Sequence, residues 1–358
     1  MTDPDLSESE SADRRASSTG TAPGGDDAPS SQALGRKMLI GLVLGLFVYA
    51  GLVFWGDLDG IRGALENFDP LWIVAGAGLS FLNYVIRFWR WQHYCGLLGI
   101  RLDGVTSLLI HLAGLSLTVT PGKMGEAFKS WLVKRVDGTP VSRSAPIVVA
   151  ERFTDLLAFL VLVAGAGLAT QPDYAWIFWA TLGLCAVLLV LLGSEAVERR
   201  ICALIARLPL GARVAPKLEH LFESTRVLLS FRRIPIPTLI ATLGWSAECF
   251  AFWLIANAFV PGEPIPFLFA TYAFALSAVA GAIVLIVPGG LGVTEGTLSG
   301  LLSARYIAAA GLAAEVARPT AVSATLIIRL CTLWFAVLLG LVALYLFTRR
   351  MRRIEGSR

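Results

Sequence analysis

Five long stretches without a charged residue constrain this chain more than any other feature of its sequence. They are residues 38–56, 156–170, 174–194, 264–294 and 330–348. A helix needs about 20 apolar residues to cross a hydrocarbon core of about 30 Å. Only 16% of the 358 residues are charged, against roughly 25% in an average soluble domain. The sequence therefore predicts an all-α, polytopic helical membrane protein.

The two ends of the chain differ in composition from the rest. Residues 1–35 are rich in Ser, Asp, Gly, Ala and Pro, and such a segment cannot bury enough apolar surface to fold. We expect a disordered polar tail there and not a signal peptide, because many apolar stretches follow the first one. Residues 36–348 are predicted to form the membrane domain, and residues 349–358 a basic tail.

Lysine and arginine beside the apolar stretches predict the orientation of the chain, because basic loops stay on the cytoplasmic side. Arg36 and Lys37 precede the first stretch, and the arginines of residues 87–101 follow the second. Residues 195–233 carry eight basic residues and apolar residues at helical spacing, which predicts a cytoplasmic amphipathic helix. We expect a multi-pass protein of the cell (inner) membrane with both termini in the cytoplasm.

A Pro-Gly-x-x-Gly motif occurs twice, and each copy follows an apolar run. The matched residues are Pro121, Gly122 and Gly125 in the first copy and Pro288, Gly289 and Gly292 in the second. Proline removes a backbone donor and glycine tolerates unusual conformations, so each motif is expected to break a helix. An ordinary proline kink in a full span is the alternative interpretation.

The short run before the first motif favours re-entrant hairpins over kinks. Residues 105–120 would reach about 24 Å as a helix, which is too short to cross. We therefore predict a re-entrant hairpin over 105–136 and a counterpart over 267–311. The charge pattern makes them enter from opposite sides, so halves 70–193 and 237–348 would form an inverted-topology repeat joined by 195–233. In transporters, paired broken helices of this kind surround the substrate site.

Nine ionisable residues lie in or beside the apolar helices close to these breaks. A charge at the centre of such a helix costs at least about 2.5 kcal/mol, so it usually faces a cavity or a partner. The nine residues therefore predict a substrate-binding cavity. They are Lys123, Glu126, Lys129, Glu151, Arg152, Asp155, Glu248, Glu295 and Arg329.

Arg152 and Arg329 come from opposite halves and are expected to converge on one polar cavity. A guanidinium group binds phosphate through two parallel hydrogen bonds, which favours an anionic headgroup as ligand. A purely structural interpretation pairs Arg152 with Asp155, three residues away, and Arg329 with Glu248 or a carbonyl. Glu248 is equally compatible with a proton carrier and with a counter-ion to either arginine.

The common catalytic and cofactor motifs are missing from the sequence. It contains no HExxH, GxSxG, Walker or CxxC motif, and its histidines and five cysteines are scattered. This pattern favours neither a metal site nor an enzyme. We expect no cofactor, no catalytic constellation and no nucleic-acid partner.

Three segments, taken together, resemble a known family. Residues 117–129, 151–155 and 287–295 are similar to signature segments of the lysylphosphatidylglycerol synthase transmembrane family, the flippase-like domain. The resemblance covers roughly residues 40–348. It implies a helical domain that moves a lipid between leaflets, as the membrane half of the bifunctional synthase is thought to move aminoacylated phosphatidylglycerol. Only ten residues follow Thr348, so we expect a stand-alone member without the soluble aminoacyl-transfer domain.

The first functional hypothesis is a lipid flippase that moves an anionic or lipid-linked phosphate headgroup between leaflets. Its partners would be membrane lipids and, as the resemblance implies, a lipid-modifying or glycan-pathway enzyme. The alternative is an integral-membrane enzyme or enzyme subunit acting on phospholipid or polyprenyl-linked substrates, with Glu126, Glu151 or Asp155 as acid or base. A third hypothesis is a structural partner that holds a cytosolic enzyme through residues 195–233.

Overall fold

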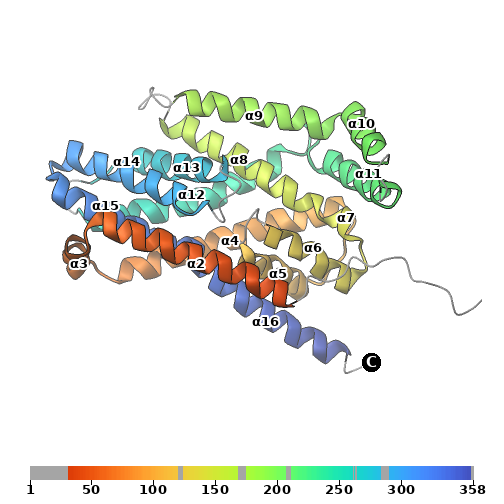
Figure 1. Ribbon diagram of the computed structural model, residues 1–358, viewed down its shortest axis with the longest axis horizontal. Coiled ribbons are helices and arrows are strands. Elements are labelled where there is room, and N and C mark those ends of the chain that lie inside the picture. Colours follow the sequence, from red (N-terminus) through yellow and green to blue (C-terminus); the bar gives the residue numbers. More distant parts are fainter. Residues whose placement is uncertain are drawn as a thin grey trace, which may run out of the picture.

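The computed structural model describes residues 31–119, 124–167, 175–206, 211–260, 262, 264–283 and 290–355. Within these ranges all regular secondary structure is helical, and the helices pack into one elongated bundle (Figure 1). The predicted all-α, polytopic membrane architecture is confirmed.

The first part of the chain supplies the helices that lie before and within the first predicted half. In order they are α2 (Ser31–Gly56), α3 (Leu58–Glu66), α4 (Leu71–Leu97), α5 (Gly104–Ala113), the 3-10 turn η1 (Gly114–Leu117), α6 (Met124–Asp137), α7 (Val141–Ser144), α8 (Pro146–Gly167) and α9 (Ala175–Gly193).

The second part begins with the basic connecting segment. Its elements are α10 (Glu195–Ala206), α11 (Gly211–Leu228), α12 (Pro235–Ala258), α13 (Phe267–Ile283), α14 (Val293–Ala310), α15 (Ala314–Arg329), the π-helical turn η5 (Leu330–Trp334) and α16 (Phe335–Glu355). The connecting segment was predicted as one amphipathic helix, but it forms the two helices α10 and α11, which pack against each other.

Three helices are long and apolar enough to cross a membrane by length and composition. They are α4, α12 and the continuous unit Ala314–Glu355, which joins α15, η5 and α16. Two bent helix pairs raise the number to five if each is one span: α2 with α3, which meet at 87°, and α9 with α10. The α8 helix has 22 residues, which is also enough for a crossing, but three of them are charged.

Both predicted breaks fall between helices. The first lies between η1 and α6, and the second between α13 and α14. The apolar helices that precede them, Gly104–Leu117 and Phe267–Ile283, have at most 17 residues, or about 26 Å at 1.5 Å per residue. The fold therefore contains the two short apolar helices expected of re-entrant hairpins. Their insertion from opposite sides stays a prediction.

The two halves pack on each other in a reciprocal manner. Helix α4 contacts α12, α5 and η1 contact α16, and α13 contacts α8. The helix before each break thus packs against the long helix that follows the broken segment of the other half. Glycine permits both close approaches: a Cβ at Gly340 of α16 would overlap the Ser116 backbone of η1, and a Cβ at Gly167 of α8 would overlap the Tyr272 ring of α13.

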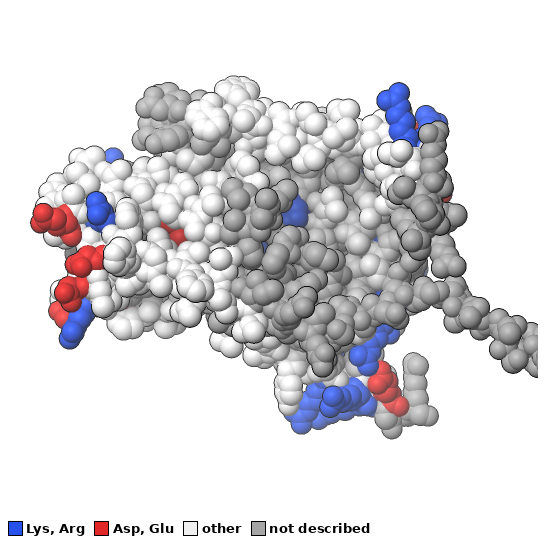
Figure 2. Space-filling view, viewed as in Figure 1, with Lys and Arg blue, Asp and Glu red and all other residues white. Residues whose placement is uncertain are grey.

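Charged side chains are unevenly distributed between the ends of the bundle. Acidic side chains predominate at the end that carries α3, whereas basic ones predominate at α10 and at the C-terminal part of α16 (Figure 2). The start of α2 and the end of α16 point toward the same end of the molecule (Figure 1).

Replacing Gly340 by alanine should destabilise the contact between α16 and η1. The added methyl group would meet backbone atoms that cannot rotate away, and overpacking of this kind costs about 1–3 kcal/mol. Thermal unfolding in detergent should show a lower midpoint for Gly340→Ala. Gly78→Ala in α4 is the control, because a Cβ there meets nothing within 4 Å. Equal midpoints for the two variants would contradict the close packing.

Candidate functional site

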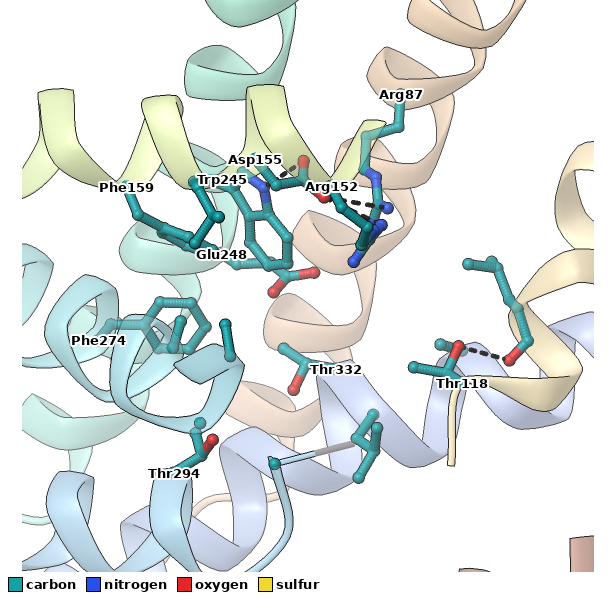
Figure 3. A pocket seen from close by; sticks show the side chains of 18 of the residues that line it. Arg87, Thr118, Arg152, Asp155, Phe159, Trp245, Glu248, Phe274, Thr294 and Thr332 are labelled. Atoms are coloured by element: carbon teal, nitrogen blue, oxygen red, sulfur yellow. Dashed lines mark hydrogen bonds and ion pairs between the residues drawn. The ribbon is translucent and has the colours of Figure 1, made fainter. Parts of the chain in front are cut away.

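A cavity of about 460 Å³ lies between the two halves of the fold. Its wall is formed by α4, α8, α12, α13, α14 and α15, and by residues beside both breaks, such as Thr118 and Gly290. Charged side chains gather at one end, where Arg87 and Arg152 lie near the Glu248 carboxylate, while Phe159 and Phe274 belong to the apolar wall (Figure 3). The cavity is therefore amphipathic.

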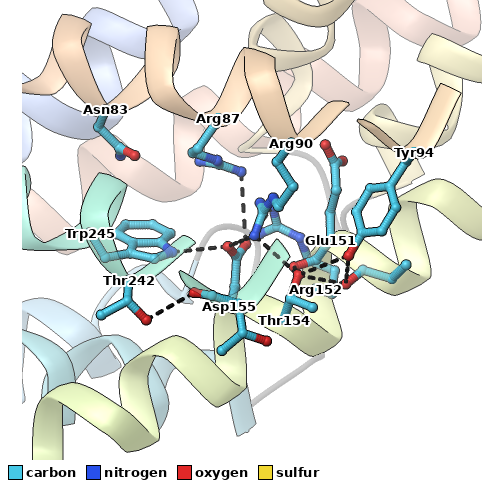
Figure 4. A network of polar contacts seen from close by, with 12 residues as sticks. Asn83, Arg87, Arg90, Tyr94, Glu151, Arg152, Thr154, Asp155, Thr242 and Trp245 are labelled. Atoms are coloured by element: carbon cyan, nitrogen blue, oxygen red, sulfur yellow. Dashed lines mark hydrogen bonds and ion pairs between the residues drawn. The ribbon is translucent and has the colours of Figure 1, made fainter. Parts of the chain in front are cut away.

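Asp155 of α8 is the centre of the charged end (Figure 4). Its Oδ1 accepts hydrogen bonds from Arg90 Nη1 at 2.7 Å and from Trp245 Nε1 at 2.9 Å. Its Oδ2 lies 2.9 Å from Arg152 Nη2 and 3.8 Å from Arg87 Nη2. One carboxylate from α8 thus faces three guanidinium groups, two of them from α4.

The charges of this cluster do not cancel. Arg90 is fully buried, and Arg87 and Asp155 are only 8% and 3% exposed. Buried cations are stable only when counter-charges or hydrogen bonds surround them, and one carboxylate cannot neutralise three arginines. Among the described members of this cluster, Arg87, Arg90, Arg152 and Asp155, positive charge therefore exceeds negative charge beside the cavity.

Arg87 is the arginine of the cluster that is best placed to bind a ligand. It lines the cavity, and its guanidinium lies 5.3 Å from the centre of the Trp245 ring. With the residues that the structure describes, Arg87 makes the long ion pair to Asp155 and no hydrogen bond, and its Nε is buried without a partner. A buried donor without a partner is costly, so an anion in the cavity would satisfy it.

Glu295 links the second break to the last span. Its Oε2 accepts from the Gly292 backbone N–H at 2.6 Å, and its Oε1 accepts from Arg329 Nε at 2.6 Å. Gly292, which precedes α14, has a φ of 86°, a left-handed conformation that favours glycine. The ion pair holds Arg329 at the wall of the cavity, where Arg152 also lies.

The structure thus brings Arg152 and Arg329 to one cavity, as the sequence predicts, although each also has an ion-pair partner. For Arg152 that partner is Asp155, as the structural interpretation supposed. For Arg329, which was expected to pair with Glu248 or a carbonyl, the described ion pair is with Glu295 and not with Glu248. The turn that follows the break brings the first turn of α14 against α15, and Glu295 is therefore within reach.

Glu248 of α12 lines the same cavity and is only 3% exposed. Its Oε1 accepts a hydrogen bond from Asn83 Nδ2 at 2.6 Å. Among the described residues no cation lies within ion-pair distance of Glu248. Glu248 and Asp155 are the two acidic residues among those that line the cavity.

Lys129 and Glu151 were also predicted to bind substrate, and the structure places them away from the cavity wall. Lys129 Nζ lies 2.5 Å from Glu151 Oε2 and 4.7 Å from the centre of the Trp91 ring. Both side chains are buried, at 4% and 1% exposure. This ion pair joins α6 to α8, as the pair between Glu295 and Arg329 joins α14 to α15.

Several predicted site residues cannot be placed. Lys123 and the break residues Pro121, Gly122, Pro288 and Gly289 lie outside the described residues. Gly125 and Glu126 lie in the first turn of α6, where only the course of the backbone is described.

Arg87 and Arg90 were missed as site residues. The charge pattern grouped them with Arg101 as basic residues that follow a span. In the structure α4 continues to Leu97, so both arginines are buried residues within the helix. The spacing of polar residues along this helix could have identified them. Asn83, Arg87, Arg90 and Tyr94 follow one another at three- and four-residue steps, which places four polar residues on one side of an apolar helix.

The described residues contain no group of three or more His, Cys, Asp or Glu side chains that could hold a metal ion. Glu151 and Asp155, two of the candidate acids or bases, are tied to cations.

Comparison with known proteins gives a consistent result. The family described as the lysylphosphatidylglycerol synthase TM region matches residues 39–340. A UPF0104 membrane protein of Methanocaldococcus jannaschii is 22% identical over 337 residues, which make up 90% of this chain and 98% of the relative. Another from Pyrococcus horikoshii is 23% identical over 332 residues, or 85% and 95%. A third from Methanothermobacter thermautotrophicus is 24% identical over 337 residues, or 87% and 96%.

Replacing Asp155 by asparagine should destabilise the protein strongly. The change leaves three buried or half-buried guanidinium groups without their shared counter-ion, and breaking a buried ion pair on one side costs about 3–5 kcal/mol. The free energy of unfolding in detergent measures this loss. Adding Arg90→Met should recover part of it, because the most deeply buried cation is then removed as well.

Glu66→Gln is the matched control for Asp155→Asn. It breaks an exposed ion pair with Arg62, and such pairs contribute about 0–1 kcal/mol. If the two variants lost the same stability, Asp155 would not be the counter-ion that the cluster requires.

Proposed function

The chain belongs to the lysylphosphatidylglycerol synthase TM region family of membrane proteins, and on this premise we propose that it moves a lipid with an anionic phosphate headgroup between the two leaflets. The observation that carries the proposal is the cavity between the halves, which combines an arginine-rich end with apolar walls. A phospholipid has the same two-part character.

The charge at the cavity favours an anionic ligand. Arg87, Arg152 and Arg329 line it, and they come from both halves of the fold. Arginine presents a planar fork of donors that matches the oxygens of a phosphate group. Since Arg87 keeps donors that no described residue accepts, a phosphate would complete its hydrogen bonding.

The size and lining of the cavity favour a headgroup with the start of its acyl chains. A volume of about 460 Å³ lies within the usual range of about 300–1,000 Å³ for small-molecule pockets. Apolar side chains such as Phe153, Leu156 and Phe274 line the rest of the space. A free inorganic phosphate would leave this apolar wall unused.

The reciprocal packing of the halves supports a transport mechanism. Each helix before a break contacts the long helix that follows the broken segment of the other half, which is the arrangement that a two-fold axis would produce. Inverted repeats around a central site commonly give alternating access by rocking of one half against the other. We therefore propose that the two predicted hairpins insert from opposite sides and open the cavity to each leaflet in turn.

The orientation follows from the distribution of charge. The end of the molecule that carries α10 and the C-terminal part of α16 is mostly basic (Figure 2), and basic segments favour the cytoplasmic side. We propose that this end faces the cytoplasm of the cell (inner) membrane, with both termini on that side.

The lipid-moving activity can be tested with purified protein in vesicles that contain fluorescent phosphatidylglycerol. A membrane-impermeant quencher reports how fast the label changes leaflet. Arg87→Gln should slow the exchange at least tenfold, and Arg87→Lys should be intermediate, because lysine keeps the charge but not the fork of donors. Arg62→Gln is the control, since that arginine is exposed on α3.

The same preparation separates the competing functions. Unchanged exchange in Arg87→Gln would contradict the phosphate site, whereas a chemically altered lipid would favour the membrane-enzyme hypothesis. Soluble glycerol phosphate should compete only weakly, because it lacks the acyl chains that the apolar wall would contact. Strong competition would favour transport of a free phosphate compound.

The orientation predicts which surface positions an impermeant thiol reagent reaches in intact cells. Cysteine in place of Asp59 of α3 should be labelled, and cysteine in place of Arg352 of α16 should be labelled only after the membrane is opened. Both positions are exposed, and all five natural cysteines are buried. Labelling of the Arg352→Cys variant in intact cells would reverse the orientation.

A further inference from the structure

Glu248 differs from the other buried carboxylates near the cavity. Asp155, Glu295 and Glu151 each form at least one ion pair within 4 Å. Within the described part of the chain, Glu248 has no such partner and accepts one hydrogen bond, from Asn83. A buried carboxylate without a paired cation loses the hydration that stabilises its charge. Of the four, Glu248 therefore takes up a proton most readily.

The groups that face Glu248 come from the helices packed against α12. Helix α4 contributes Arg87 and the Tyr84 hydroxyl, α8 contributes Asp155, and α15 contributes Arg329. Helix α13 carries no charged residue. The Tyr84 hydroxyl donates to the Thr332 carbonyl at 2.7 Å and is thereby occupied. Arg152 of α8 lines the same cavity, so the described cations nearest to Glu248 are Arg87, Arg152 and Arg329, none of them within ion-pair distance.

A phosphate in the cavity would change this balance. It would accept hydrogen bonds from Arg87, whose donors are otherwise available, and it would add a negative charge to the space that Glu248 also lines. A like charge nearby disfavours the ionised form of a carboxyl group. Binding of the anion therefore favours protonation of Glu248, and by linkage protonation strengthens binding of the anion to the same degree.

We propose that Glu248 is a proton-binding site coupled to the phosphate site, so that one proton and one lipid anion are carried together. This inference rests on the proposed function. An O–H bond forms on the Glu248 carboxylate with a proton from water on the entry side, and it breaks on the exit side when the lipid leaves. A phosphodiester monoanion and one proton make the transported pair electrically neutral. A pH gradient then supplies energy for the transport.

The test uses vesicles that hold the full-length protein and fluorescent phosphatidylglycerol, with a pH gradient across the membrane. The wild type should accumulate the label in the leaflet that faces the alkaline side. One proton per lipid gives a leaflet ratio of up to about tenfold for each pH unit. Glu248→Gln, which cannot release a proton, should reach a ratio of one at steady state, whatever its rate. Glu315→Gln, at an exposed position of α15, should accumulate like the wild type.

The outcomes are distinguishable. Exchange in the wild type with a leaflet ratio of one under the gradient would overturn the proton coupling and leave the lipid-moving function standing. Absence of exchange in the wild type would overturn the proposed function and the coupling with it. Accumulation in Glu248→Gln would show that another group carries the proton.

Binding provides a second measurement that does not depend on the transport rate of Glu248→Gln. Affinity of the solubilised wild type for short-chain phosphatidylglycerol should be highest at low pH and fall as pH rises through the titration of Glu248. The Glu248→Gln variant should show no such decrease. A wild-type affinity that is independent of pH, or the same pH dependence in both proteins, would contradict the inference.

Discussion

The need to neutralise buried arginines is the constraint on which the rest of this structure depends. Arg87 and Arg90 lie inside α4, where apolar surroundings make an isolated guanidinium unfavourable. Asp155 supplies the counter-charge from α8, and it also binds Arg152 and Trp245. This contact fixes α4, α8 and α12 relative to one another. The side of the cluster that carries Arg87 and Arg152 forms the charged end of the cavity.

Buried ion pairs have a second use in the fold. Lys129 with Glu151 and Glu295 with Arg329 each join the helix after a break to the long helix that follows it in the same half. The sign of the charges is reversed between the two pairs. Such pairs contribute little net stability once desolvation is counted, but they penalise any other arrangement of the helices. They are therefore suited to setting the position of the broken segments, while glycine allows the helix before each break to approach the other half closely.

The sequence was informative wherever a single segment determined the outcome. The apolar stretches, the break before α14 and the presence of Arg152 and Arg329 at one cavity all follow from local composition and the cost of charge in an apolar helix. Partner choice was not predictable, because it depends on how helices far apart in the sequence meet. Glu248 could not be told from Glu295 as the partner of Arg329, and Lys129 and Glu151 could not be assigned to a place behind the wall. Arg87 and Arg90 were hidden because a count of basic residues does not distinguish a loop from the buried end of a long helix.

The continuous unit Ala314–Glu355 has a mechanical consequence. Its 42 residues would extend about 63 Å as a helix, roughly twice the thickness of the hydrocarbon core. A rod of that length cannot be contained by the bilayer, so its arginine-rich tip must stand clear of the lipid chains. The π-helical turn lies near the middle, directly after Arg329, and its Thr332 carbonyl is held by the Tyr84 hydroxyl of the opposite half. The turn therefore joins the protruding arm directly to the helix that carries Arg329 at the cavity wall.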